Sequence, residues 1–126
     1  MTDNLNPSIR VVMMPHMTNP QGTIFGGIIL SYIDQAGATE AVRKTGHRRF
    51  VTVAMDKIVF HEPVFIGDLV SFYAEVTRIG NTSITVKVCV ESARFKNVHE
   101  TVEVTEADVI YVAVDEFGQK TSIKQG

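Results

Sequence analysis

The chain has 126 residues and a mass of 13.9 kDa, the size of one domain, because two domains of that total length would each lack a core. Hydrophobic residues make up 44% of it and charged residues 21%, which is typical of a folded globular domain. The formal net charge is only −2, which argues against a dedicated nucleic-acid binder, and no nucleic-acid partner is expected.

The sequence gives no sign of export, membrane insertion or cross-linking. The first residues lack the basic and apolar segments of a signal peptide, and the longest apolar run, residues 24–30, is too short to cross a bilayer. Cys89 is the only cysteine, so neither an intrachain disulfide nor a multi-cysteine metal cage can form. We therefore expect one cytoplasmic, soluble domain over residues 1–126, with flexible ends at residues 1–7 and 119–126.

The first third of the chain predicts a short strand, a loop and a long helix. Residues 9–14 form an apolar run that ends at a proline, and residues 16–22 are rich in turn-forming residues. Residues 26–45 contain no proline and repeat apolar residues at helical spacing. Basic residues in the last turn, followed by Gly46, are typical of a helix C-terminus.

The rest of the chain changes to the two-residue period of strands. A hairpin-type turn begins at Gly80. In the last strand the alternation slips near Glu106, which indicates a β-bulge or an interface-facing section. The predicted strands cover residues 50–60, 69–78, 84–91 and 99–114.

This order predicts an α+β fold with one helix and a five-stranded antiparallel sheet. One helix covers only one face of such a sheet. The other face and the sheet edges then need solvent or a partner, so we expect the chain to self-associate.

The junction between the loop and the helix carries the strongest candidate for chemistry. Gly26 and Gly27 would let a ligand approach the N–H groups of the helix start, which suit a phosphate or an oxyanion. Asp34 lies almost two turns after Gly27, so both share a face with small and apolar residues, namely Leu30, Gly37, Ala38 and Ala41. An acid on that face is either functional or a buried carboxylate that only bonds a neighbouring segment; the pattern leaves both open.

Other polar residues give weaker signals. Cys89 lies in a strand without an activating neighbour, so a structural role is expected. The glycines lack the spacing of a dinucleotide fingerprint or a P-loop, and the basic run at residues 45–49 is typical of a solvated helix end. No metal-ligand spacing connects the histidines, so no metal and no cofactor are expected; they are His16, His47, His61 and His99.

The motif Asn19-x-x-Gly22-x-x-x-Gly26-Gly27, followed by Asp34, resembles the signature of hot-dog-fold acyl-CoA thioesterases. The resemblance is to the bacterial single-domain acyl-CoA thioester hydrolases of the YciA type. Met17 stands where members of this family often carry a carboxylate. The similarity covers roughly residues 9–118 and includes the segments 53–60, 63–68, 80–83 and 111–115.

The resemblance implies a long helix wrapped by a curved sheet, with two sheets paired into a dimer and dimers usually assembled into a hexamer. Asn19 and Asp34 match the family's catalytic positions, which come to one site from opposite subunits. The amides of Gly26 and Gly27 would stabilise an oxyanion, and Asp34 would activate water or attack the thioester carbonyl. Asn19 would position the water or the carbonyl.

Coenzyme A is then part of the substrate rather than a cofactor. Met55, with Leu30 and Ile58, would set the acyl-chain length. Residues expected to contact the CoA portion are Gly80, Asn81, Thr82, Ser83, Arg94 and Lys96; an ordinary hairpin and surface charges are the alternative for them. Two other functions stay open. A non-catalytic acyl-CoA sensor would need no carboxylate, and an acyl-thioester dehydratase would need a histidine, for which His16 and His47 are nearest in sequence.

Overall fold

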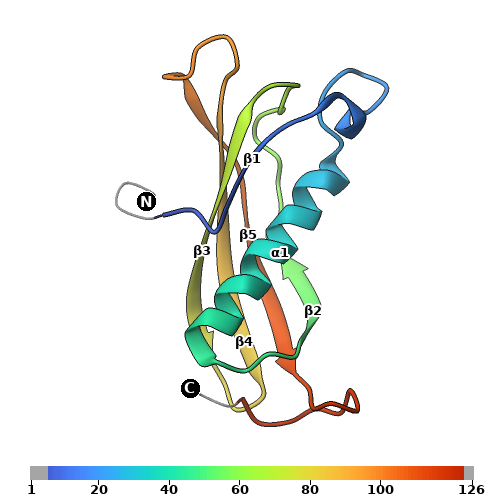
Figure 1. Ribbon diagram of the computed structural model, residues 1–126, viewed down its shortest axis with the longest axis vertical. Coiled ribbons are helices and arrows are strands. Elements are labelled where there is room, and N and C mark those ends of the chain that lie inside the picture. Colours follow the sequence, from blue (N-terminus) through green and yellow to red (C-terminus); the bar gives the residue numbers. More distant parts are fainter. Residues whose placement is uncertain (1–5, 124–126) are drawn as a thin grey trace.

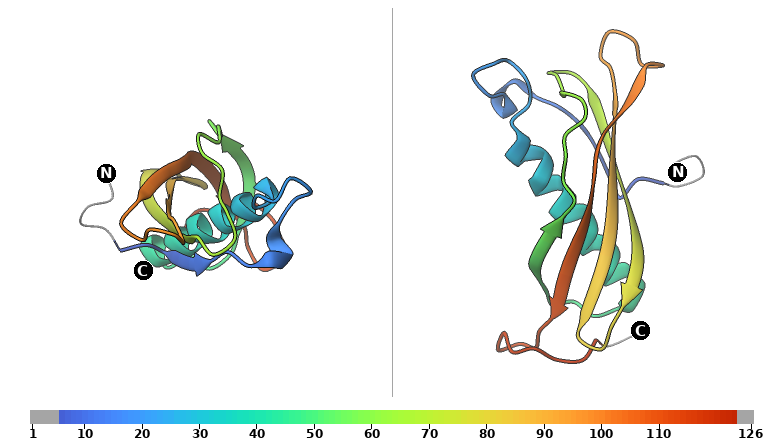
Figure 2. Two further views of the ribbon diagram at one scale, coloured as in Figure 1. Left: turned by 90° about the horizontal axis from the view of Figure 1, so that it is seen from above. Right: turned by 180° about the vertical axis from the view of Figure 1, so that it is seen from behind.

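The computed structural model describes residues 6–123, which form one curled antiparallel sheet packed against one long helix (Figure 1). The elements are β1 (Ile9–Val12), η1 (Pro15–Met17), α1 (Gly26–Thr45), β2 (Phe50–Asp56), β3 (Leu69–Ile79), β4 (Ser83–Ala93) and β5 (Thr101–Ala113). The strand order is β1-β3-β4-β5-β2, so β1 and β2 are the edges. Seen from above, the sheet wraps around α1, which confirms the expected α+β architecture (Figure 2).

The ends of the chain are described only in part. Residues 1–5 and 124–126, where flexible ends were expected, lie outside the described residues. Within the tail, Thr121 N–H donates to the Ala113 carbonyl at 3.0 Å, and Ile123 N–H donates to the Asn81 carbonyl at 2.9 Å. These bonds tie residues 121–123 to the bottom of the sheet.

Helix α1 has the predicted bounds, but its buried face differs from the predicted one. The fully buried side chains include the large Ile29 and Ile33, together with Ala36 and Ala41. Large side chains decide the orientation because their burial removes the most apolar surface from water. Of the predicted stripe, Gly37 and Ala41 are buried, Gly27 is exposed, and three residues are only half-buried, namely Leu30, Asp34 and Ala38.

Gly37 lets the helix pack closely over β5. A Cβ atom at this position would collide with the hydroxyl of Tyr111, whose ring is fully buried beneath the helix. That hydroxyl donates a hydrogen bond of 2.8 Å to the main-chain carbonyl of Asp34. The glycine therefore makes room for a tyrosine that holds the helical turn carrying Asp34.

Strand β5 contains the predicted bulge. Val90 of β4 pairs with Thr105, but Glu91 pairs with Glu103, so Val104 is an extra residue on β5. Both Val104 and Thr105 are buried. Beyond the bulge the side chains on the core side are Ala107, Val109, Tyr111 and Ala113. The phase slip expected near Glu106 is thus confirmed, two residues earlier.

Strand β2 ends at Asp56, so the prediction that it continues to residue 60 is wrong. Lys57 has a φ of 63°, in the left-handed region, and this turns the backbone out of the sheet. The following segment bonds to the bulge instead: His61 N–H donates to the Val104 carbonyl at 2.8 Å, and the Thr105 hydroxyl donates to the Val59 carbonyl at 2.7 Å.

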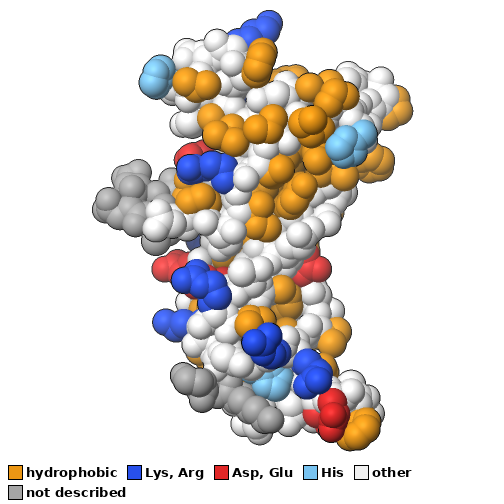
Figure 3. Space-filling view, viewed as in Figure 1, with side chains coloured by type: hydrophobic (Ala, Val, Ile, Leu, Met, Phe, Trp, Pro, Cys, Tyr) orange, Lys and Arg blue, Asp and Glu red, His pale blue; other side chains and the backbone are white. Residues whose placement is uncertain are grey.

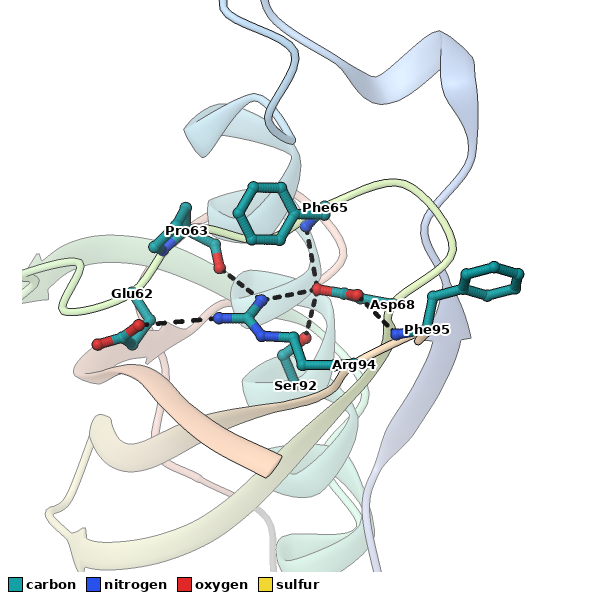
Figure 4. A network of polar contacts seen from close by, with 7 residues as sticks. All are labelled: Glu62, Pro63, Phe65, Asp68, Ser92, Arg94 and Phe95. Atoms are coloured by element: carbon teal, nitrogen blue, oxygen red, sulfur yellow. Dashed lines mark hydrogen bonds and ion pairs between the residues drawn. The ribbon is translucent and has the colours of Figure 1, made fainter. Parts of the chain in front are cut away.

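A buried carboxylate joins two loops at the top of the sheet (Figure 4). The Asp68 side chain is 2% exposed and forms an ion pair of 2.8 Å with Arg94, itself 12% exposed. Arg94 also donates to the Pro63 carbonyl at 2.8 Å. The remaining donors to the Asp68 carboxylate are Phe65 N–H at 3.0 Å, Phe95 N–H at 3.0 Å and Ser92 Oγ at 3.1 Å. The β2–β3 connection and the β4–β5 loop are thereby fixed to each other.

These contacts predict how stability depends on pH. Burial alone would raise the pKa of Asp68, but the hydrogen bonds from Phe65, Arg94, Phe95 and Ser92 outweigh it and hold the pKa below its ordinary 3.8. A carboxylate with a lowered pKa in the folded state stabilises the fold above its unfolded pKa, and this contribution is lost as pH falls through the folded pKa.

We expect Asp68→Asn to lower the free energy of unfolding by about 3 kcal/mol at pH 7, because the buried Arg94 loses its closer counter-ion and keeps only the ion pair of 3.7 Å with the more exposed Glu62. The difference from the wild type should shrink as pH falls from the unfolded pKa of about 4 through the lower pKa of the folded state, where the wild-type carboxylate becomes protonated. Urea unfolding followed by circular dichroism at pH 7, 5 and 3, at one protein concentration, measures it. Glu116→Gln, at an exposed position, is the control. Equal stability of Asp68→Asn and wild type at pH 7 would contradict the assignment.

Candidate active site

Asp34 lies at the border of the buried face of α1, beside the edge strand β2. Its side chain is half-buried, and the Thr52 hydroxyl donates to Oδ1 at 2.7 Å. Among residues 6–123 no donor bonds the other oxygen, Oδ2. The carboxylate therefore bonds a neighbouring strand, as expected of a carboxylate with only a structural role. Its second oxygen nevertheless stays available to a water molecule or a substrate.

Two residues from neighbouring strands hold Asp34 in place. Thr52 of β2 is directly opposite Tyr111 of β5 in the register of the sheet, so the two side chains extend from the same face. Thr52 bonds the carboxylate and Tyr111 bonds the carbonyl of the same residue. Val53 forms a bulge immediately afterwards. Burial and then the charge of Asp34 raise the pKa of the Tyr111 hydroxyl well above 10, so it stays a neutral donor.

The start of α1 offers unpaired donors. Its N-cap residue, Phe25, makes no side-chain capping bond, and the first turn holds no acidic residue. No acceptor for the amides of Gly26 and Gly27 occurs in the part of the chain that the structure describes. A Cβ atom at either glycine would meet only aromatic side chains, at 3.7 Å or more. The fold of one chain therefore does not require these glycines, which favours close approach of another molecule.

A pocket of about 340 Å³ opens beside this helix start. Gly26 and Ile29 of the helix line it on one side, and the segment after β2 lines it on the other, with Phe60, His61 and Glu62. Sequence reasoning missed both His61 and Thr52, because each lies far along the chain from the glycine motif. The bulge contacts that bring His61 back over the sheet leave no local signal in the sequence.

Asn19 shapes the loop that precedes the helix. Its Oδ1 accepts hydrogen bonds from Gln21 N–H at 3.0 Å and Thr23 N–H at 3.1 Å, and its Nδ2 donates to Thr23 Oγ1 at 2.8 Å. Gly22 has a φ of 89°, which only glycine adopts freely. The loop lies beyond the N-terminal end of α1, whereas Asp34 is the helix's ninth residue (Figure 1). One chain does not bring these two residues together.

The residues expected to hold CoA fall into two distant groups. The turn Gly80–Ser83 is at one end of β4, and Arg94 and Lys96 follow the other end (Figure 1). An eleven-residue strand separates them by about 33 Å, at 3.3 Å per residue. They cannot form one CoA site within one protomer. Arg94, moreover, is engaged by Asp68 and Pro63 rather than being a free surface cation.

The remaining expectations concern the acyl chain and metals. Met55 is half-buried and packs against the core together with Leu30 and Ile58. Over residues 6–123, no three His, Cys, Asp or Glu side chains are grouped so as to bind a metal ion. In the same range no helix combines the length and apolarity needed to cross a membrane.

Residues 21–94 match the Thioesterase superfamily. The acyl-CoA thioester hydrolase YciA of Salmonella typhimurium is 39% identical over 113 residues, which is 88% of this chain and 84% of that protein.

Two solved structures extend this similarity to the fold. The hexameric hotdog-fold thioesterase of Campylobacter jejuni is 48% identical, with a TM-score of 0.88 over 97% of this chain and 92% of the other. The hexameric thioesterase of Yersinia pestis is 36% identical, with a TM-score of 0.87 over 97% and 98%. The curled sheet around one helix, the glycine pair at the helix start and these similarities agree: the chain belongs to the thioesterase superfamily, as a hot-dog-fold relative of the acyl-CoA thioester hydrolases.

Proposed function

We propose that the protein hydrolyses acyl-CoA thioesters to a free carboxylic acid and CoA. The observation that carries the proposal is the Asp34 carboxylate, which Thr52 fixes through one oxygen while the other stays available. The same helix begins with uncapped amides at two glycines. Relatives at about 40% identity, among them YciA of Salmonella typhimurium, are named acyl-CoA thioester hydrolases.

The geometry suits attack on a thioester carbonyl. In one route Asp34 takes a proton from water, the water oxygen bonds to the carbonyl carbon, and the C–S bond breaks to release the CoA thiolate. In the other route the carboxylate itself attacks, and water then hydrolyses the resulting anhydride. In both routes the amides of Gly26 and Gly27 would stabilise the negative charge on the carbonyl oxygen. Because they lie about 10 Å along the helix from Asp34 of their own chain, at 1.5 Å per residue, a second chain would supply them. The proposal holds for either route.

The site is proposed to be shared between two copies of the chain. Strand β2 is an open edge, and Val51 and Val53 on it are 49% and 55% exposed. Pairing two such edges would join two sheets and bring a second chain next to Asp34. Asn19 of that chain could then reach the carboxylate with its second Nδ2–H, because Thr23 accepts only the first.

Higher assembly is part of the proposal. The relatives from Campylobacter jejuni and Yersinia pestis are described as hexameric. We propose a hexamer made of three such dimers for this chain as well.

One observation favours a second candidate function, dehydration of an acyl thioester. His61 lines the pocket next to Gly26, so a histidine does lie near the proposed oxyanion site. Release of free CoA, followed with a thiol-reactive dye over a panel of acyl-CoA chain lengths, separates the candidates, since only hydrolysis releases CoA. Cys89 should not interfere with that assay, because burial raises the pKa of its thiol to about 11.

Asp34→Ala should abolish turnover, with kcat reduced by roughly a thousandfold or more, because a general base or nucleophile is lost. Glu40→Gln, which removes a carboxylate on the same helix that forms an ion pair with Arg43, should keep wild-type activity. Steady-state rates measured on the folded variants test this expectation. A tenth of the wild-type rate in Asp34→Ala would exclude Asp34 as the catalytic group.

Thr52→Val should lower kcat by about 10- to 100-fold with little change in KM, since the variant keeps the side chain's shape but loses the donor that orients Asp34. Thr52→Ser, which retains a hydroxyl, should restore most of the rate. A purely structural role for Thr52 predicts instead that both variants lose thermal stability and keep kcat.

Mixing Asn19→Ala with Asp34→Ala tests the shared site. Each variant alone should be inactive. After subunit exchange, random pairing makes half of the dimers mixed, and each mixed dimer has one site with both residues intact. About a quarter of wild-type activity should therefore return. If native mass spectrometry shows exchanged dimers and no activity reappears, the two residues do not act across an interface.

A further inference from the structure

An exposed apolar patch lies at the end of the molecule opposite the β3–β4 turn. We call it the tip patch and define it by its exposed fractions: Phe95 at 71%, Val98 at 66%, Ile66 at 45% and Phe65 at 41%. Hydrophobic side chains gather at this end of the molecule, the top of Figure 3. Single exposed apolar residues are ordinary, but four from two adjoining loops mark a surface that binds another molecule.

The tip patch is held rigidly. The Asp68 carboxylate accepts the amides of both Phe65 and Phe95, so the two loops cannot move apart without breaking buried bonds (Figure 4). Gly67, with a φ of 86°, leaves no room for a side chain, because the Phe95 ring packs directly on its backbone at 2.9 Å from the Cβ position. An exposed aromatic ring that is already ordered loses little entropy on binding.

The patch adjoins a pocket with charged side chains at its rim. The pocket has a volume of about 440 Å³ and is lined by Phe65, Ile66, Asp68, Arg94, Phe95, Lys96 and Glu100. Lys96 and Glu100 carry opposite charges at the exposed rim. The surface thus has a projecting Phe95 ring, a pocket, and the opposite charges of Lys96 and Glu100 beside them. Such a surface complements a second copy of itself in head-to-tail contact.

The tip patch is separate from the edge proposed to form the dimer. Strand β2 pairs only with residues 108–113 of β5. The patch lies beyond the opposite end of β5, which begins at Thr101. A dimer joined through β2 would therefore leave the patch in water. A hexamer of three dimers needs a second interface, different from the first, and head-to-tail contacts close into a three-fold ring.

We propose that the tip patch is the interface between dimers, with Phe95 of one protomer seated in the pocket of a protomer from the next dimer. This inference rests on the proposed hexamer and not on the proposed chemistry. Lys96 of one copy would then face Glu100 of the next. The aromatic ring in the centre would carry most of the binding energy, and the charges at the rim would fix the orientation.

Phe95→Ser tests the proposal, because it removes the ring and keeps the amide that bonds Asp68. We expect the protein concentration at which hexamers half-dissociate into dimers to rise at least tenfold, as is typical when a central aromatic residue is truncated. Analytical ultracentrifugation and native mass spectrometry measure it. Phe117→Ser is the matched control: this phenylalanine is 79% exposed but lies after β5, at the other end of the molecule, so that variant should assemble like wild type.

Val98→Asp provides a second, independent variant, since Val98 takes no part in the hydrogen bonds to Asp68 and its side chain is 66% exposed. It should dissociate hexamers as well, even if Phe95→Ser proves poorly folded by circular dichroism. CoA release per chain at saturating substrate should stay near wild type in both dimeric variants, because Asp34 and Thr52 lie at the β2 edge.

Two results would overturn the proposal: a wild-type protein that is a dimer at all concentrations, or a folded Val98→Asp that remains hexameric like wild type. Dissociation of the Phe117→Ser control would also count against it. Failure of the wild type to release CoA would instead overturn the proposed chemistry, and the assembly measurements would stand independently.

Discussion

The contact between Tyr111 and the underside of α1 fixes the relation of helix to sheet. A tyrosine ring fits there only because residue 37 has no side chain, and its hydroxyl then reaches the main chain of Asp34. A hydroxyl buried at this depth needs an acceptor, so the contact is favourable only in one position of the helix along the strand. Thr52, opposite Tyr111 in the sheet, donates a hydrogen bond to the side chain of the same Asp34. One cross-strand pair thus sets both the fold and the candidate site.

Much of this architecture could be predicted from local sequence. The helix ends where basic residues in the last turn are followed by Gly46, which adopts a φ of 78° as its C-cap. The slip in alternation along β5 correctly indicated the bulge now seen at Val104. Both features are encoded by neighbours in the chain, and for that reason they were visible in it.

Long-range contacts set the features that the sequence did not reveal. The apolar pattern continues past Asp56 as it would in a strand, but Lys57 adopts a left-handed conformation and the segment bonds to the bulge of β5 instead. Ile29 and Ile33 rotate the helix so that Asp34 lies at the border of the buried face rather than in its middle. Neither outcome follows from the periodicity of one element.

The residues of the candidate site also divide into those that local sequence reveals and those that only long-range contacts bring into place. The glycine pair and Asp34 stand out because they lie on one helix and depend on helical spacing alone. Thr52 was missed because the bulge at Val53 and the register of two strands decide which residue faces Asp34. Arg94 looked like a free cation because its partner, Asp68, lies 26 positions earlier and only the fold brings the two together.

The open edge at β2 also matters before the protein is assembled. A chain that has just folded alone presents unpaired main-chain N–H and C=O groups along this strand, flanked by the exposed Val51 and Val53. Such an edge pairs with any extended segment it meets, including those of unrelated unfolded chains. Rapid pairing with a second copy would therefore protect the newly made chain from aggregation. The fraction of chains that escape aggregation in a crowded environment would then depend on how many copies are made at the same place and time.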